Sequence, residues 1–405
     1  MLKRYFLNNK KRNFSTASIW IKGGSDMDST GKKGINKILC SLLTRGCEGF
    51  NNFTLSEYIE SYGAELNQEV FEDGISISIK SLNEHFSKLF PLLDLIINKP
   101  ILSETEFKKV KKSSIDHIKK DKENPFNICF EKWRKIVYSN HPYAFNTIGN
   151  ANDVSKITYE DVLLEFKNLK NREKYLISNN LEINGVSIET LEKKNLEEKS
   201  ITLNHDLSPN SRFDYNNNDS NQTIIMMGDQ TCSRRSSEYF PLKVLESYLS
   251  YGMSAALFKL FREKHGITYD LGVYYPIRSG NAPFLIYLSV SNEQALFAFE
   301  LLSTLWKNLL FNPLTDAEIF LAKEKLKGSF LLGNQSLDEI LQRKIQLVSY
   351  GISPISENDL NSKIEEISSL DILKLTNKYF SKPFLSISGN KNICLEISNR
   401  WKKNF

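Results

Sequence analysis

The chain has 405 residues, of which 40% are hydrophobic and 25% are charged, as in an ordinary folded globular protein. At roughly 100–200 residues per domain, this length predicts two domains. The net charge of +5 is mild, and no RNA- or DNA-binding motif accompanies the lysine-rich run 108–112, so we interpret that run as a solvated helix face. No apolar run reaches the roughly 18–20 residues that a membrane-spanning helix needs.

The basic N-terminus and the cysteines bear on the cellular compartment. Residues 1–25 contain six basic residues and no acidic one, a composition that also suits an organellar targeting segment. However, a strand-like run at 18–21 already begins there, so a cleaved leader would remove the start of the fold. The five cysteines form no CxxC pair, which favours reduced thiols over a disulfide framework or a cysteine-type zinc site. We therefore expect a cytoplasmic protein.

Taken in chain order, the first half opens with a predicted strand at 18–22. A run of alternating residues follows at 75–79, and this alternation is typical of an antiparallel sheet with one wet face. A Ser-x-x-Glu capping box that ends at Glu106 predicts the start of a long helix. An amphipathic helix then begins near Asp161, and an apolar strand follows at 175–178.

The second half repeats these elements. Residues 204–222 are rich in Asn, Asp and Ser and predict an exposed linker, and a strand follows at 223–227. A Thr-x-x-Glu capping box ends at Glu318, a helix begins near Asp371, and an apolar strand covers 384–387. The offsets are 212 residues for Glu106 and Glu318, 210 for Asp161 and Asp371, and 209 for Tyr175 and Phe384. A nearly constant offset indicates an internal duplication.

These elements predict an α+β fold of two tandem homologous halves. Each half is expected to be a mainly antiparallel sheet with helices covering one face. We assign 1–203 to the N-terminal half, 204–222 to the linker and 223–405 to the C-terminal half. The second half also carries an insertion, which we place in the turn-rich stretch 278–283.

The sequence contains few of the motifs that mark a catalytic site. No two of the five histidines can share a helix face, and neither a phosphate-binding loop nor a G-x-S-x-G elbow is present. Arg262 and Tyr269 lie seven residues apart across a corner at Gly266, where a guanidinium and a phenol can converge on one carbonyl. Spacing alone favours the plainer alternative, a surface arginine at a helix end and a half-buried tyrosine.

Three segments resemble the pitrilysin, insulinase and mitochondrial processing peptidase family of zinc metallopeptidases. The run from Gly24 to Gly34 resembles the family's G-S-x-x-E…G lead into the zinc helix. The run from His141 to Asp161 resembles its H-P-Y…G…I-T-x-x-D segment. The most specific match is 252–269, which resembles G-M-S-S-R-L-F…R-E-x-x-G-x-x-Y. The resemblance extends over nearly the whole chain and implies the same fold of two α+β halves.

The resemblance also shows where this chain departs from the family. The family's zinc helix reads G-x-x-H-x-x-E-H, and alignment places Lys37 at the first histidine, Cys40 at the general-base glutamate and Ser41 at the second histidine. The third ligand, a downstream glutamate, aligns with His117. A lysine repels a divalent cation. Without the metal ligands and the general base, the chain would lack the groups that zinc-assisted attack of water on a peptide bond requires. We expect no catalytic residues and no metal in this chain.

Arg262 and Tyr269 match a pair that the family's two-chain members carry in the subunit without the zinc motif, and this match favours a substrate-binding role. We predict a non-catalytic, substrate-binding subunit that acts on short unstructured peptides together with a zinc-bearing subunit of the same family. The alternatives are a structural scaffold subunit and, with less support, an autonomous peptidase with an unorthodox site. No nucleic-acid or membrane partner is expected. The sequence leaves open the peptide, the identity of the partner and the choice between homodimer and heterodimer.

Overall fold

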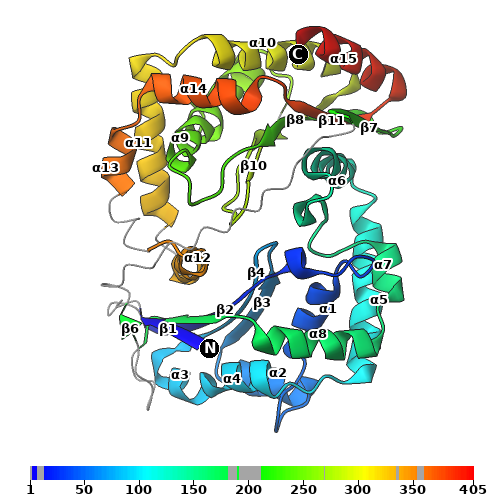
Figure 1. The fold of residues 1–405 in the computed structure, drawn as a ribbon, viewed down its shortest axis with the longest axis vertical. Helices are drawn as coiled ribbons and strands as arrows, with labels where there is room; N and C mark the ends of the chain where they lie inside the picture. The colour runs from blue at the N-terminus through cyan, green and yellow to red at the C-terminus, as the bar shows by residue number, and fades with distance from the viewer. Residues whose placement is uncertain are drawn as a thin grey trace. The chain divides into compact units, whose positions relative to one another are not determined.

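The computed structural model describes residues 2–6, 13–180, 189–190, 211–268, 270–333, 337–353 and 360–405 (Figure 1). The chain forms two compact units, and each unit combines segments that are far apart in the sequence. Unit 1 comprises Met1–Lys120, Phe145–Ser200 and Gly333–Glu357, and unit 2 comprises Asp121–Ala144, Ile201–Leu332 and Asn358–Phe405.

Unit 1 is built on a sheet with the strand order β3-β4-β2-β5-β1-β6. The strands are β1 (Leu2–Phe6), β2 (Phe14–Lys22), β3 (Glu65–Val70), β4 (Gly74–Leu82), β5 (Lys174–Ser178) and β6 (Glu189–Thr190). Only the pairings of β1 with β5 and β6 are parallel in the described sheet. Ile19, Ile75 and Ile77 point from one face into a core that is covered by helices. These are α1 (Ile35–Leu43), α2 (Asn52–Ser61), α3 (Asn83–Leu89), α4 (Pro91–Asn98), α5 (Glu104–Asp121), α7 (Ala151–Lys156) and α8 (Tyr159–Asn171).

Unit 2 repeats this arrangement, with the strand order β7-β11-β8-β10-β9. Its strands are β7 (Phe213–Asn217), β8 (Gln222–Gln230), β9 (Asp270–Tyr274), β10 (Pro283–Ser291) and β11 (Phe384–Gly389). The pairing of β7 with β11 is parallel and the other described pairings are antiparallel. The helices over the core face are α9 (Tyr239–Ser250), η3 (Phe258–Lys264), α10 (Ala295–Phe311), α11 (Asp316–Gly333), α13 (Leu360–Glu365), α14 (Ser369–Phe380) and α15 (Lys391–Asn404). The predicted α+β class with two mainly antiparallel sheets is confirmed.

Each sheet also carries one helix on its second face, and that helix comes from the other end of the chain. In unit 1 this helix is α12 (Leu337–Ser349), which packs on β2 and β5. The Ser76 hydroxyl donates to Gln342 Oε1 at 2.7 Å, and the Thr16 hydroxyl donates to Asp338 Oδ1 at 2.7 Å. In unit 2 the helix is α6 (Pro125–Tyr138), which packs on β8 and β11. Ser76, which belongs to the alternating run that suggested a wet face, therefore lies under a helix.

Five strands of unit 1, in the order β3-β4-β2-β5-β1, correspond to β9-β10-β8-β11-β7 of unit 2, and β6 has no counterpart in the described part of unit 2. Asp161 and Asp371 occupy the same position in complete capping boxes at the starts of α8 and α14. Glu106 and Glu318 both lie in the first turn of a long helix, in α5 and α11. The longer connection of the second half is the one between β9 and β10, at 275–282. We keep 1–203 and 223–405 as the proposed repeats.

The predicted linker 204–222 is only partly a linker. Residues 204–210 lie outside the described part of the chain, but Phe213–Asn217 form β7, which pairs with β11. The reason is that Phe213 stacks on Tyr215 and Trp401, so two aromatic side chains anchor a strand within an otherwise polar stretch. Because Asn216 and Asn217 are paired with β11, we do not expect limited proteolysis to begin there, as it would in an exposed linker.

All five cysteines are buried and none is in a disulfide in the described part of the chain. Among the described residues, no helix has both the length and the apolar character needed to cross a membrane.

Candidate functional site

The candidate site is centred on α1, whose first turn is fixed by an aspartate. Asp28 accepts hydrogen bonds from the backbone N–H of Gly34 at 2.6 Å, from the backbone N–H of Asn36 at 3.1 Å and from the Asn36 side chain at 2.7 Å. A carboxylate is favoured at a helix N-terminus, where backbone N–H groups lack partners. Burial nevertheless raises the pKa of Asp28 to about 6. Gly34 is at φ +98°, and a Cβ there would lie 2.6 Å from the Ile148 carbonyl oxygen, so this start requires glycine.

Within α1, the positions that align with a zinc site carry side chains that cannot form one. Lys37 is half-buried and Cys40 is fully buried. The Cys40 thiol donates to Gln68 Oε1 at 3.5 Å. Burial and the nearby Glu69 raise the pKa of Cys40 to about 12, against the opposing effect of Lys37. The thiol therefore stays protonated at neutral pH, and only the thiolate is a good metal ligand or nucleophile.

The strand next to α1 completes this environment. β3 is an edge strand of the sheet and packs against α1. It places Gln68 beside Cys40, and it places Glu69 close enough to Lys37 for an electrostatic interaction. Burial raises the pKa of Glu69, while Lys37 lowers it. Cys40, at the aligned general-base position, thus lies next to the Gln68 amide and near the Lys37 ammonium.

His117, which aligns with the third zinc ligand, lies on an exposed part of α5. Ser41 is half-buried on α1, one residue after Cys40. Among the described residues, which include all four aligned positions, no group of three or more His, Cys, Asp or Glu side chains is arranged to hold a metal ion. The donor set therefore does not fit the His/His/Glu zinc site of the aligned motif.

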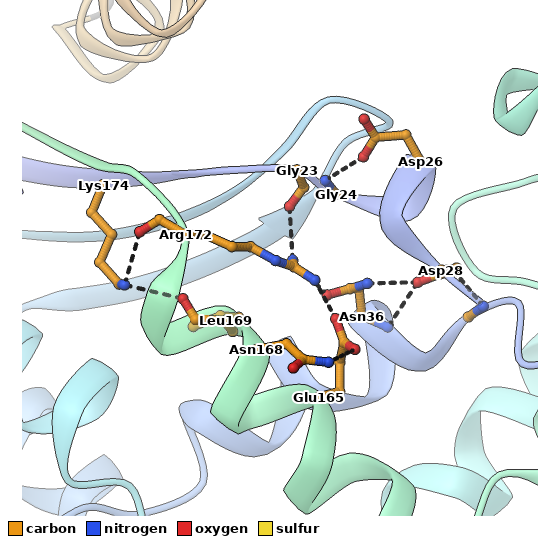
Figure 2. A network of polar contacts seen from close by, with 11 residues as sticks. Gly23, Gly24, Asp26, Asp28, Asn36, Glu165, Asn168, Leu169, Arg172 and Lys174 are labelled. Atoms are coloured by element: carbon orange, nitrogen blue, oxygen red, sulfur yellow. Dashed lines mark hydrogen bonds and ion pairs between the residues drawn. The ribbon is translucent and has the colours of Figure 1, made fainter. Parts of the chain in front are cut away.

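A buried ion pair between Arg172 and Glu165 contacts the start of α1. The sequence analysis did not predict this ion pair. Figure 2 shows Arg172, from the end of α8, between Gly23, Asn36 and Glu165. Its guanidinium donates to the Gly23 carbonyl at 3.0 Å, to Asn36 Oδ1 at 3.0 Å and to the Glu165 carboxylate. The Arg172 and Glu165 side chains are 9% and 8% exposed. The network ties the end of β2 and the start of α1 to α8.

Asp26 lies at the edge of the same network. It accepts the Gly24 N–H at 2.7 Å, as Figure 2 shows. Burial, together with the negative charge of Asp73, raises the pKa of Asp26 to about 7. The Gly-Ser-Asp sequence marked this segment, but the spatial neighbours that shift the pKa are distant in sequence.

In unit 2, the segment that carries Arg262 differs from the predicted α-helix. Phe258–Lys264 is wound as a π-helix, a rare form that is frequent at functional sites. Arg262 is exposed, and its guanidinium lies 4.9 Å from the centre of the Phe258 ring. The helix ends as predicted at Gly266, which is at φ +60°. Tyr269 lies outside the described residues. The edge strand β9 begins at the next residue, Asp270.

Two α+β units that each hold one sheet, with α1 at the position that aligns with a zinc-motif helix, define a metallopeptidase-like fold. The sequence profile described as "Insulinase (Peptidase family M16)" matches residues 4–151, and the one described as "Peptidase M16 inactive domain" matches residues 166–326. The chain belongs to the M16 peptidase family.

Relatives and solved structures agree with this assignment. An uncharacterized zinc protease of Rickettsia felis is 24% identical over 371 residues, covering 89% of this chain and 88% of the relative. The uncharacterized zinc protease YmxG of Bacillus subtilis is 22% identical, covering 96% and 99%. The fold is similar to that of an M16 inactive domain from Pseudomonas fluorescens, with a TM-score of 0.83, 19% identity and 96% of each chain covered. It is also similar to that of a protease from Helicobacter pylori, with a TM-score of 0.82, 16% identity and 95% of each chain covered.

Proposed function

We propose that this chain is a non-catalytic, substrate-binding subunit that works with a zinc-bearing subunit of the same family on short unstructured peptides. The observation that carries the proposal is the chemistry of α1. The helix keeps its capping aspartate and its supporting arginine, but the aligned ligand and base positions hold Lys37, Cys40 and Ser41. The fold is retained while the groups that would activate water are replaced.

Peptide binding is supported by the edges of the two sheets. β3 and β9 are edge strands in the described sheets, and the free backbone groups of an edge strand can pair with an extended peptide. Along β3 the side chains alternate between exposed and less exposed up to Glu69. A peptide added there would meet Gln68 and Glu69 rather than a metal. An unstructured peptide suits this mode because its backbone is free to pair.

Arg262 and Tyr269 are the proposed substrate contacts. Arg262 is exposed on the last turn of η3, where a guanidinium presents several N–H donors in a planar fork. Donors aimed at a peptide carbonyl stabilise the negative charge that develops on its oxygen during hydrolysis. Zinc in the partner subunit would supply the activated water. This chain would bind and orient the peptide and hold no zinc.

We also propose a cytoplasmic location, which the five free, buried cysteines support.

The test is reconstitution with a zinc-bearing M16 chain and measurement of kcat/KM on an unstructured peptide. Arg262→Ala and Tyr269→Phe should each lower kcat/KM by about 10²–10³, and Arg262→Lys should not restore activity because an ammonium lacks the planar fork. Arg400→Ala, which removes an exposed arginine of α15 that pairs with Glu300 and Glu396, is the matched control. The chain alone should contain no stoichiometric zinc by elemental analysis. Full activity in both Arg262 and Tyr269 variants would instead favour a structural scaffold role.

A further inference from the structure

Unit 2 contains a cavity that the proposed peptidase role does not use. It has a volume of about 380 Å³ and lies between α9, η3, α10 and α11. This volume falls in the range of small-molecule sites, roughly 300–1,000 Å³. Part of its wall is aliphatic and consists of Leu260, Leu301, Leu305 and Ala322.

Three lysines from two elements also line this cavity. Lys259 and Lys264 belong to η3, and Lys325 belongs to α11. Among the residues that the structure describes, no carboxylate lies within ion-pair distance of any of these three ammonium groups. Other lysines of the same unit do have such partners. Lys243 lies 2.6 Å from Glu246, and Lys327 lies 2.7 Å from Glu324. The described part of the cavity wall thus holds three lysines and one carboxylate, Glu318, and none of the lysines forms an ion pair with it.

Glu318, the carboxylate among the described residues that line the cavity, already accepts hydrogen bonds from other side chains and from the backbone. Glu318 Oε2 accepts hydrogen bonds from the Thr315 N–H at 2.9 Å and the Thr315 hydroxyl at 2.8 Å, and its Oε1 accepts from the Tyr248 hydroxyl at 3.1 Å. Burial raises the pKa of Glu318, but these hydrogen bonds and the smaller effect of the Lys259 ammonium outweigh burial and hold the pKa below its ordinary value. Glu318 therefore serves mainly as the cap of α11, and its attraction to Lys259 acts at longer range than an ion pair.

The lysines also repel one another. Burial lowers the pKa of Lys325, and the nearby Lys259 ammonium lowers it further. An anion placed between Lys259 and Lys325 would relieve this repulsion, because an opposite charge favours the charged form of each.

We propose that this cavity binds a small ligand with a carboxylate and a short aliphatic chain. The carboxylate would lie among Lys259, Lys264 and Lys325, and the chain would pack against Leu260, Leu301 and Leu305. A fatty acid and the free C-terminus of a leucine-rich peptide share this chemistry. The inference does not depend on a substrate role of Arg262.

The experiment is isothermal titration calorimetry of the full chain with octanoate, octanamide, and acetyl-Leu-Leu as acid and as amide. Octanoate should bind at least about tenfold more tightly than octanamide, a difference of about 1.4 kcal/mol, and its affinity should fall with added salt. Lys325→Gln and Lys259→Gln should each weaken octanoate binding about five- to tenfold. Lys391→Gln, an exposed lysine of α15 outside the cavity wall, should leave it unchanged.

The two sources are distinguished by the peptide arm of the titration. Binding of octanoate but not of the dipeptide acid would assign the site to fatty acids, and tighter binding of the dipeptide acid than of its amide would assign it to peptide C-termini. Leu305→Trp, which fills the cavity from a half-buried position, should abolish binding while circular dichroism stays unchanged. Equal affinity for octanoate and octanamide, no binding at millimolar octanoate, or full affinity in Lys325→Gln would each overturn the proposal.

Discussion

Replacing Arg172 by methionine tests whether the buried ion pair behind α1 stabilises unit 1. The change removes the donors to Gly23, Asn36 and Glu165 in one step. The Glu165 side chain, 8% exposed, would then keep, from the described residues, its 3.3 Å hydrogen bond from Asn168. Breaking one partner of a buried ion pair leaves a buried, uncompensated charge, which costs about 3–5 kcal/mol.

The assay is urea denaturation at pH 7, followed by far-UV circular dichroism. Arg172→Met should lower the urea midpoint with little change in the slope of the transition. Because a unit of this size loses roughly 2–4 °C in Tm for each kcal/mol, the melting temperature should fall by about 6–20 °C. Adding Glu165→Gln to Arg172→Met should restore part of the loss, since the orphaned charge is then removed.

The matched control is Lys99→Met. Lys99 pairs with Glu48 in the same unit, but the two side chains are 58% and 61% exposed, and exposed pairs contribute little to stability. If Arg172→Met costs no more than Lys99→Met, the network in Figure 2 does not stabilise α1 and the reasoning is wrong.

Two further predictions concern titratable groups of the candidate site. The pKa of Asp26 is raised from 3.8 to about 7, so the folded chain binds this proton more tightly than the unfolded chain between those values. Stability should therefore fall as the pH rises from about 4 to 7 and then level off. Asp26→Asn should flatten this slope and raise the free energy of unfolding at pH 8 by roughly 2–4 kcal/mol, and an unchanged slope in urea titrations would contradict the assignment. Cys40, whose pKa is raised to about 12, should react with iodoacetamide roughly 100–1,000-fold more slowly in the folded chain than in urea, as mass spectrometry of its peptide can show. Comparable rates would mean that the thiol is accessible.

Local sequence signals determined most of the fold. Capping boxes specify helix starts through side chains three residues apart, so Asp161 and Asp371 could be placed without tertiary information. Alternating strands and a constant offset then revealed the duplication and the antiparallel sheets. The difference from the family's zinc motif at Lys37, Cys40 and Ser41 could also be predicted from the sequence, because the resemblance compares residue identity at fixed spacing on one helix.

Tertiary structure decided which helix covers the second face of each sheet, why β7 forms inside a polar stretch, and which groups meet around Arg172. Ser76 looks solvent-facing in the alternating run 75–79, but both Ser76 and Thr16 donate hydrogen bonds to residues of α12 that lie more than 260 positions away in the sequence. The π-winding at Arg262 and the lysine-lined cavity also had no local signal. The physical reason is the same in each case. Periodicity and capping depend on neighbours in the chain, whereas burial, ion pairing and pKa shifts depend on neighbours in space.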